Sequence, residues 1–293
     1  MIIGYPERLA VDHRALLDAA EAAGFDAELV APSRLALAID EHGERVLVDG
    51  VVRPPRVVLP RGVNRPWPLL RQILEVWEMQ GVVVVPSVRA ADLCADKVLT
   101  TRVLAAAGVP VLPTVAVNPG GGVSLTHLAD RGALVAKPAR ASKAAGVERF
   151  DDVAAARAVL GSERALVAGM VDHQVVQPLA TTAGVDFRVV VAGGCAVAVT
   201  ERRAPAGDFV TNRPGSTVSD VEDPGHTVPE VVTVAVAAAR ALGLEFGGVD
   251  VIRHEGRAVV LEVNAWPGLA AHVRNEQLAR SLLAVVTNRS GHP

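Results

Sequence analysis

The chain has 293 residues, 50% of them hydrophobic, and a formal net charge of −3 at pH 7. It is long enough for one large domain or for two or three smaller ones, and it can build a substantial core. The near-neutral charge argues against nucleic acid or a membrane as a partner, because it offers no general attraction to either.

The first ninety residues alternate strand-like runs with helical patterns. The runs Met1–Gly4, Val57–Leu59 and Val82–Val85 favour strands, and His13–Ala23 favours a helix. A second helix, apolar on one face, is expected to end at Gly81. This alternation predicts a small open parallel sheet.

The central third predicts a unit of the size of a lid rather than a full sheet. A helix over Asp96–Ala107 is followed by a segment rich in Pro and Gly, which marks a change of unit. Strand Leu134–Lys137, helix Asp151–Leu160 and strand Gln174–Gln177 then form a short βαβ-like pattern.

The last third begins with two strands. They are expected within Asp186–Val199, around a turn at Gly193–Gly194. The polar stretch Ala204–Gly225 has little periodicity and is predicted to be a mobile loop. Helices are expected over Pro229–Leu242 and His272–Val286.

Between those two helices, the segment Gly248–Asn264 predicts a hairpin that carries acids. With a three-residue loop over Glu255–Arg257, Asp250 lies directly opposite Glu262, and Asn264 follows two residues later on the same side. The other side is apolar, and it consists of Val249, Val251, Leu261 and Val263.

Two carboxylates this close raise each other's pKa unless a cation lies between them. A few hard oxygen ligands, with coordination positions left for phosphate oxygens, are typical of a nucleotide-bound Mg²⁺ site. The hairpin alone leaves a second interpretation open, which is an edge hairpin with ordinary solvated acids.

The compartment is predicted from two features. No run of eighteen apolar residues lacks a charged residue, so we expect no transmembrane helix. Cys94 and Cys195 are the only cysteines, and neither has a Cys or His neighbour at metal-ligand spacing. We expect two buried, reduced thiols and a soluble protein in the cytoplasm.

Eight short motifs follow one another along the chain, and they are Asp96-Lys97, Ala136-Lys137, Val176-Gln177, Asp186-Phe-Arg188, Glu201-Arg-Arg-Ala204, Gly207-Asp-Phe209 with Asn212, Val249-Asp250, and Glu262-Val-Asn264 with Pro267-Gly268. In this order and spacing they resemble the ATP-grasp superfamily, and within it the RimK-type α-L-glutamate ligases. The likeness runs from about Asp92 to Leu269 and is thin over the first ninety residues.

The resemblance implies an α/β protein with the ATP-grasp fold. Residues 1–93 would form an N-terminal parallel-sheet (pre-ATP-grasp) domain. Residues 94–177 would form a central domain with a small lid subdomain over ATP, and residues 178–293 a C-terminal α+β domain with the metal site.

The resemblance also assigns the nucleotide contacts. Lys97 and Lys137 would contact the phosphates, because a lysine is a compact cation suited to them. Gln177, Pro178 and Leu179 would belong to the hinge strand, where the backbone N–H of Leu179 or Ala180 would meet adenine. Asp186 would lie near the ribose hydroxyls.

Four further residues would surround the transferred phosphate, and they are Arg188, Arg202, Arg203 and Asn212. Guanidinium groups aimed at a charged transition state are what phosphoryl transfer requires. Asp250, Glu262 and Asn264 would hold Mg²⁺, or Mn²⁺. Without the resemblance, the pair of Asp186 and Arg188 would be interpreted as a cross-strand ion pair.

The chain departs from the family pattern in the lid loop. The family's loop is rich in glycine, whereas the segment Pro138–Gly146 keeps one, and alanine tolerates positive φ poorly. We therefore predict that Arg140, Ser142 and Lys143 supply side-chain donors to the triphosphate. The glycine pair usual after the Asn212 position is also absent.

The resemblance implies an ATP-dependent, ADP-forming carboxylate–amine ligase. It would add an amino acid, glutamate-like, to a carboxylate of a small molecule, peptide or protein through an acyl phosphate. A peptide, natural-product or carrier-protein ligase and a catalytically silent nucleotide-binding protein are the alternatives. The acceptor would meet Arg61, Asn64 and the segment Trp266–His272, and relatives commonly form homo-oligomers.

Overall fold

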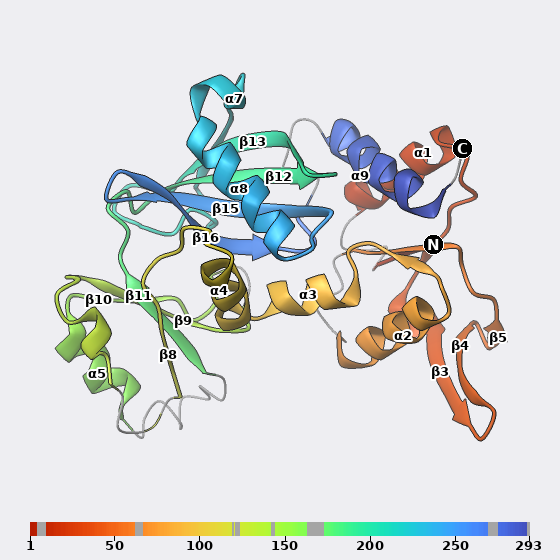
Figure 1. The fold of residues 1–293 in the computed structure, drawn as a ribbon, viewed down its shortest axis with the longest axis horizontal. Coiled ribbons are helices and arrows are strands. Elements are labelled where there is room, and N and C mark those ends of the chain that lie inside the picture. The colour runs from red at the N-terminus through yellow and green to blue at the C-terminus, as the bar shows by residue number, and fades with distance from the viewer. Residues whose placement is uncertain are drawn as a thin grey trace.

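The computed structural model describes residues 1–4, 10–61, 67–118, 120, 124–141, 144–162, 173–268 and 275–291. Its strands form four sheets, one parallel and three antiparallel, with helices packed between and over them (Figure 1). None of the helices in these ranges is long and apolar enough to span a bilayer. Cys94 is half-buried and Cys195 is exposed, so the expectation of two buried thiols is wrong for Cys195.

The N-terminal sheet has the order β2-β1-β6-β7 and is parallel throughout, as predicted. Helix α2 packs on one face, where Ile73 and Trp77 meet the strands. Helices α1 and α9 pack on the other face, so the C-terminal helix completes the N-terminal core. The bounds are β1 Ile2–Ile3, α1 Ala10–Ala22, β2 Leu29–Val30, β6 Val57–Pro60, α2 Trp67–Met79, β7 Val83–Val84 and α9 Asn275–Ser290.

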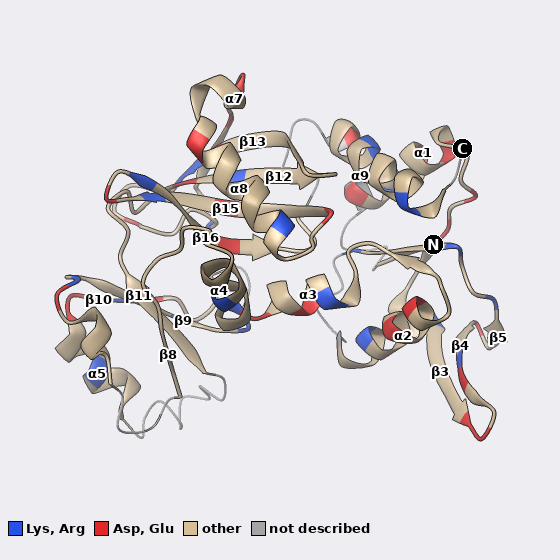
Figure 2. Cartoon of the chain, viewed as in Figure 1, with Lys and Arg blue, Asp and Glu red and all other residues tan. Residues whose placement is uncertain are grey.

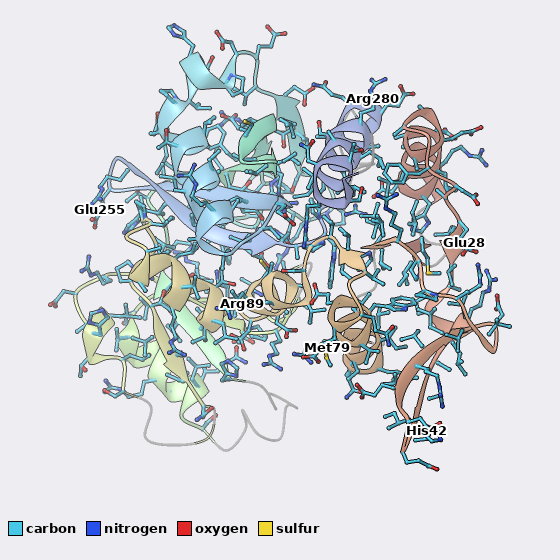
Figure 3. The ribbon with its side chains drawn as sticks, turned by 45° about the vertical axis from the view of Figure 1, so that its right-hand side comes forward. Glu28, His42, Met79, Arg89, Glu255 and Arg280 are labelled. Carbon is cyan, nitrogen blue, oxygen red and sulfur yellow. The ribbon has the colours of Figure 1, made fainter. Side chains whose placement is uncertain are left out.

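A small antiparallel sheet follows β2 and was not predicted. It consists of β3 (Leu35–Asp40), β4 (Gly43–Val48) and β5 (Val51–Val52), preceded by a 3-10 turn at Pro32–Arg34. Its buried residues join the core under α2. Its tip, at His42, lies at the opposite end of the molecule from Glu255 (Figure 3).

The central sheet has the order β10-β9-β11-β8 and is antiparallel. It has a small core of its own, to which α5 contributes Ala156 and Leu160. The bounds of this region are α3 Val88–Ala95, α4 Lys97–Ala106, β8 Val115–Val117, η2 Thr126–Leu128, β9 Leu134–Pro138, β10 Glu148–Phe150, α5 Val153–Leu160 and β11 Gln174–Pro178. We call this sheet the lid sheet.

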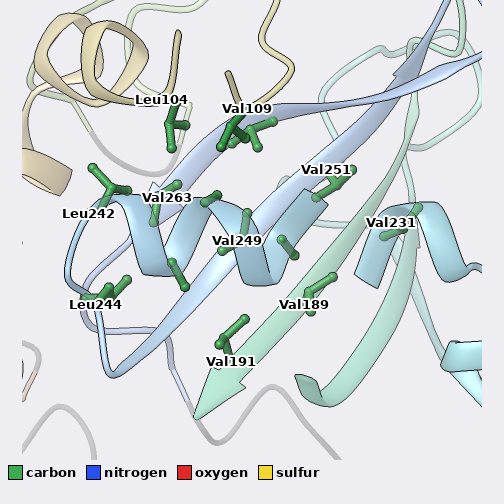
Figure 4. Close-up of a cluster of buried hydrophobic side chains, with 14 of the residues drawn as sticks. Leu104, Val109, Val189, Val191, Val231, Leu242, Leu244, Val249, Val251 and Val263 are labelled. Carbon is green, nitrogen blue, oxygen red and sulfur yellow. The ribbon is translucent and has the colours of Figure 1, made fainter. Parts of the chain in front are cut away.

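The C-terminal sheet has the order β14-β13-β12-β15-β16 and is antiparallel. Helix α8 covers one face, where valine, leucine and alanine side chains form the core that Figure 4 shows. The bounds are β12 Val185–Ala192, β13 Cys195–Arg203, β14 Thr217–Asp220, α7 Pro224–Thr227, α8 Pro229–Ala241, β15 Phe246–His254 and β16 Arg257–Asn264. The prediction of a mobile loop over Ala204–Gly225 is wrong where β14 and α7 form.

The β15–β16 hairpin confirms the predicted pairing of Asp250 with Glu262, but the predicted three-residue loop is wrong. Its turn has two residues, Glu255 and Gly256, both at positive φ (49° and 76°). Val251 pairs with Val260 near the turn, and Asp250 pairs with Glu262 beyond it, so Leu261 is an extra residue in β16. This bulge restores the acid pair and brings Leu261 to the face of Ile252 and Val259 rather than the core under α8, contrary to prediction.

Charged residues of both signs are interspersed, for example along α2 and α9 (Figure 2), as expected for a chain with a small net charge. The three-part division at residues 93 and 177 stays a prediction.

Candidate functional site

A cleft lies between the lid sheet and the face of the C-terminal sheet that carries Asp186 and Asp250, and it gathers predicted residues from distant parts of the chain. Strands β9 and β11 supply one wall, while β12, β13, β15 and β16 supply the other. The predicted residues that line it are Lys97, Lys137, Gln177, Pro178, Leu179, Asp186, Arg202, Asn212, Asp250 and Glu262.

Two lysines face one acid in this cleft. Lys137, on β9, is 9% exposed, and burial lowers the pKa of its ammonium to about 8, despite the opposing attraction of Glu262. Lys97, at the first turn of α4, has its Nζ 3.5 Å from Glu262 Oε1 and donates to the carbonyl of Ala141 at 2.6 Å. Cations held out of water in this way favour an anionic ligand.

In a second cluster, acids and arginines from three strands pair with one another. Arg188 on β12 donates through Nε and Nη2 to both carboxylate oxygens of Asp250, the Nη2 bond being 2.8 Å. Arg202 on β13 donates to both oxygens of Asp186 at 2.7 Å, and its Nη2 lies 3.1 Å from Asp250 Oδ1. The Thr211 hydroxyl donates to Asp186 at 2.6 Å, a contact that sequence reasoning missed.

In this cluster the pKa values of the two buried carboxyls, Asp186 and Asp250, shift in opposite directions. Burial raises the pKa of Asp186, and the neighbouring Asp250 adds to the rise, against the hydrogen bonds from Arg202 and Thr211. Burial also opposes ionisation of Asp250, but the attraction of Arg188 and Arg202 keeps the pKa of Asp250 below its usual range. Asp250 is therefore a carboxylate whose counter-ions are arginines.

The predicted metal ligands share one face of the hairpin. Asp250 and Glu262 are register partners, and Asn264 pairs with Gly248 two positions on. In the described part of the chain no three His, Cys, Asp or Glu side chains are placed to hold a metal ion together. A third ligand would therefore be the amide oxygen of Asn264, whose Nδ2 is buried without a hydrogen bond. The oxygen donors fit a hard divalent cation. Such a cation would compete with Arg188 and Arg202 for the carboxylate of Asp250.

The hinge strand β11 closes the cleft at its apolar end. The Gln177 amide donates to the Thr114 hydroxyl at 2.9 Å, and the Leu179 N–H donates to the Ala133 carbonyl at 2.8 Å. Of the two backbone donors considered for adenine, the Leu179 N–H is thus engaged, and Ala180 remains. Leu112, Ile252 and Leu261 add an apolar wall. The sequence could have placed Ile252 in the cleft, because it lies two residues after Asp250 on the same face of β15. Leu261 faces the cleft only because of the bulge in β16.

Several predicted residues lie elsewhere. Arg203 points away from Arg202 along β13, is exposed, and pairs with Glu201 at 2.6 Å, so it does not line the cleft. Arg140 donates to Asp96 at 3.1 Å, which is not the role predicted for it. Ser142 and Lys143 lie outside the described residues.

The predicted acceptor side begins with Arg61, which is 3% exposed. Burial lowers the pKa of Arg61 to about 10, with Asp12 opposing the change. Its Nη2 donates to the Pro267 carbonyl at 2.5 Å, and Pro267 in turn lies against Gly248, beside Arg188. Asn64 and residues 269–272 lie outside the described residues.

Comparison with known proteins matches residues 94–285 to the model of the RimK-like ATP-grasp domain. A probable α-L-glutamate ligase of Enterobacter sp. (strain 638) is 30% identical over 87% of this chain and 83% of its own length. A RimK domain ATP-grasp protein from Sphaerobacter thermophilus superposes with a TM-score of 0.70 at 23% identity, covering 97% of this chain and 98% of that one. The ATP-grasp ligase PsnB, complexed with a phosphomimetic precursor variant, Mg and ADP, gives 0.68 at 20% identity, covering 97% of each chain.

These structural neighbours show that the fold is that of ATP-grasp ligases, in agreement with the mixed α/β sheets described above. The family model spans well over half of the chain and includes both walls of the cleft. The chain therefore belongs to the RimK-like ATP-grasp family of ligases.

Proposed function

We propose that this chain is an ATP-dependent, ADP-forming ligase that joins a carboxylate to an amine. The observation that carries the proposal is the composition of the cleft, where Lys97 and Lys137 face the acid pair Asp250 and Glu262. A triphosphate with a divalent cation carries both kinds of charge that these groups would bind.

The nucleotide would lie with its base at the apolar end of the cleft and its phosphates at the charged end. Leu112, Ile252 and Leu261 would contact the adenine, whose edge would meet the backbone at Ala180. Lys97 and Lys137 would bind phosphate oxygens. Asp250, Glu262 and Asn264 would hold Mg²⁺, or Mn²⁺, and the cation would neutralise charge on the β and γ phosphates.

The reaction would proceed in two displacements. An oxygen of the substrate carboxylate attacks the γ phosphorus, the bond to the β-phosphate oxygen breaks, and ADP leaves. The amine nitrogen then attacks the acyl carbon of the acyl phosphate, inorganic phosphate leaves, and the nitrogen loses a proton as the amide forms. Lys137, Arg188 and Arg202 would align and stabilise the transferred phosphate, together with Asn212, which also lines the cleft.

For the substrates we propose an amino acid of the glutamate type as the amine and a small molecule, peptide or protein as the carboxylate. The name of the Enterobacter relative supports the first choice. The PsnB complex with a precursor supports a peptide or natural-product ligase as the second candidate. The acceptor would approach from the side of Arg61, which joins the N-terminal sheet to Pro267.

The test is a screen for ADP and phosphate release with ATP, Mg²⁺, amino acids and candidate carboxylates. Turnover should need both substrates. Glu262→Gln should abolish it while leaving the fold intact, whereas Glu245→Gln, which removes an acid paired with Arg289, should leave turnover unchanged. Wild-type turnover by Glu262→Gln would contradict the metal assignment. Nucleotide binding without ADP release for any pair would favour a silent nucleotide-binding protein.

A further inference from the structure

The lid loop is joined to helix α4 by one buried carboxylate. Asp96 is 4% exposed and caps α4 through Oδ1, which accepts from the backbone N–H groups of Val98 and Leu99 at 2.9 and 3.2 Å. Its second oxygen faces the other way. Oδ2 lies 3.1 Å from Arg140 Nε and 3.4 Å from His173 Nε2.

The backbone reinforces this junction. The Lys97 N–H donates to the Ala139 carbonyl at 3.0 Å, and the Ala139 N–H donates to the His173 carbonyl at 2.9 Å. Three segments distant in sequence therefore meet at Asp96, and they are the start of α4, the loop after β9 and the residue before β11.

The two sides of the junction belong to different cores. Helix α4 packs through Leu104 into the core under α8, and the chain after it bonds to β16 through the Pro110 carbonyl and the Val260 N–H at 2.9 Å. The loop belongs to the lid sheet, which has its own core. Asp96 thus links the lid sheet to the sheet that carries Asp250 and Glu262.

We propose that Asp96 is a positioning residue for the nucleotide, which holds the loop after Lys137 against α4 through Arg140 and His173. The proposal rests on the proposed nucleotide site. Lys97 follows Asp96 directly and Lys137 lies two residues before Ala139, so this junction sets how the two lysines lie across the cleft. The loop is poor in glycine, and Ala144 takes a φ of 56°, which alanine tolerates poorly. The contacts of Asp96 would help to hold the loop in this conformation.

The variants exploit the two functions of Asp96. Asp96→Asn keeps a helix cap, because asparagine caps as well as aspartate, but removes the charge toward Arg140 and His173. Arg140→Ala removes the arginine partner of Asp96 and leaves the contact with His173 in place, without touching α4. The matched control is Arg149→Ala. Arg149 is an exposed arginine of the lid sheet, and its Nη2 lies 3.6 Å from Asp151 Oδ1.

The first measurement is hydrogen exchange in the nucleotide-free protein. Asp96→Asn and Arg140→Ala should speed exchange over residues 137–141 about fivefold, the scale of one partly exposed ion pair. The double variant should match Asp96→Asn, because that substitution has already removed the ion pair that Arg140→Ala would remove. Exchange in β15 and the melting temperature should not change, and Arg149→Ala should behave as the wild type.

The second measurement is calorimetric binding of ADP with Mg²⁺. Both junction variants should weaken affinity about fivefold, and in a turnover assay they should raise KM for ATP more than they lower kcat. Wild-type exchange in Asp96→Asn, or additive effects in the double variant, would overturn the proposal. A wild-type protein that binds no nucleotide would refute the proposed function, while the exchange data would still decide whether Asp96 holds the loop.

Discussion

The buried ammonium of Lys137 should cost the protein stability that a neutral side chain would restore. The pKa of Lys137 falls from the ordinary 10.5 to about 8, chiefly because of burial. At about 1.4 kcal/mol for each pH unit, this difference corresponds to a destabilisation of about 3 kcal/mol. The proposed role of Lys137 as a phosphate ligand would account for this cost.

The sign of the pH dependence follows from proton binding. Below pH 8 the folded and unfolded chains both carry the proton on Lys137, so the penalty is fully present. Between about pH 8 and 10.5 the unfolded chain holds the proton and the folded chain does not, so stability rises with pH. Above 10.5 the penalty is gone.

Lys137→Met should therefore be more stable than the wild type at pH 7 by up to about 3 kcal/mol, and the gap should shrink by about 2 kcal/mol at pH 10. Denaturant unfolding at both pH values measures the gap. Titrating groups that do not interact with Lys137 cancel in the comparison. Arg203→Met, which removes an exposed cation, is the control. The same Lys137 variant should bind ADP with Mg²⁺ about tenfold to a hundredfold more weakly. A stability gap that does not change with pH would refute the reasoning.

Two further predictions concern Arg188. Arg188→Met leaves Asp250 with Arg202 as its remaining arginine partner, so it should lower the free energy of unfolding by about 2–4 kcal/mol. The control Arg203→Met should change this free energy by less than about 0.5 kcal/mol. Equal effects of the two variants in denaturant unfolding would contradict the buried network. Gly248→Ala would place a Cβ 3.0 Å from Pro267 Cβ and 3.2 Å from Arg188 Cδ, so Arg188 would have to shift. Turnover should then fall roughly tenfold, with KM for ATP little changed. A wild-type kcat would show that the position of Arg188 is not critical.

The sequence by itself determined most of the elements and the chemistry of the acidic hairpin. Period-2 and period-3.6 patterns are local, so strands such as Leu134–Pro138 and helices such as α8 were predicted to within a few residues. The opposition of Asp250 and Glu262 was predicted and confirmed, although for an incorrect loop length. The order of the motifs was enough to identify the family, because eight spaced residue groups rarely coincide.

Tertiary structure decided which of those groups meet. The bulge at Leu261 places an apolar side chain on the cleft face, and the register of β13 turns Arg202 inward and Arg203 outward. The pairing of Arg188 with Asp250, and of Asp96 with Arg140, joins residues that are 62 and 44 positions apart. Such contacts depend on strand register and on how separate cores pack, and neither is encoded in a local periodicity.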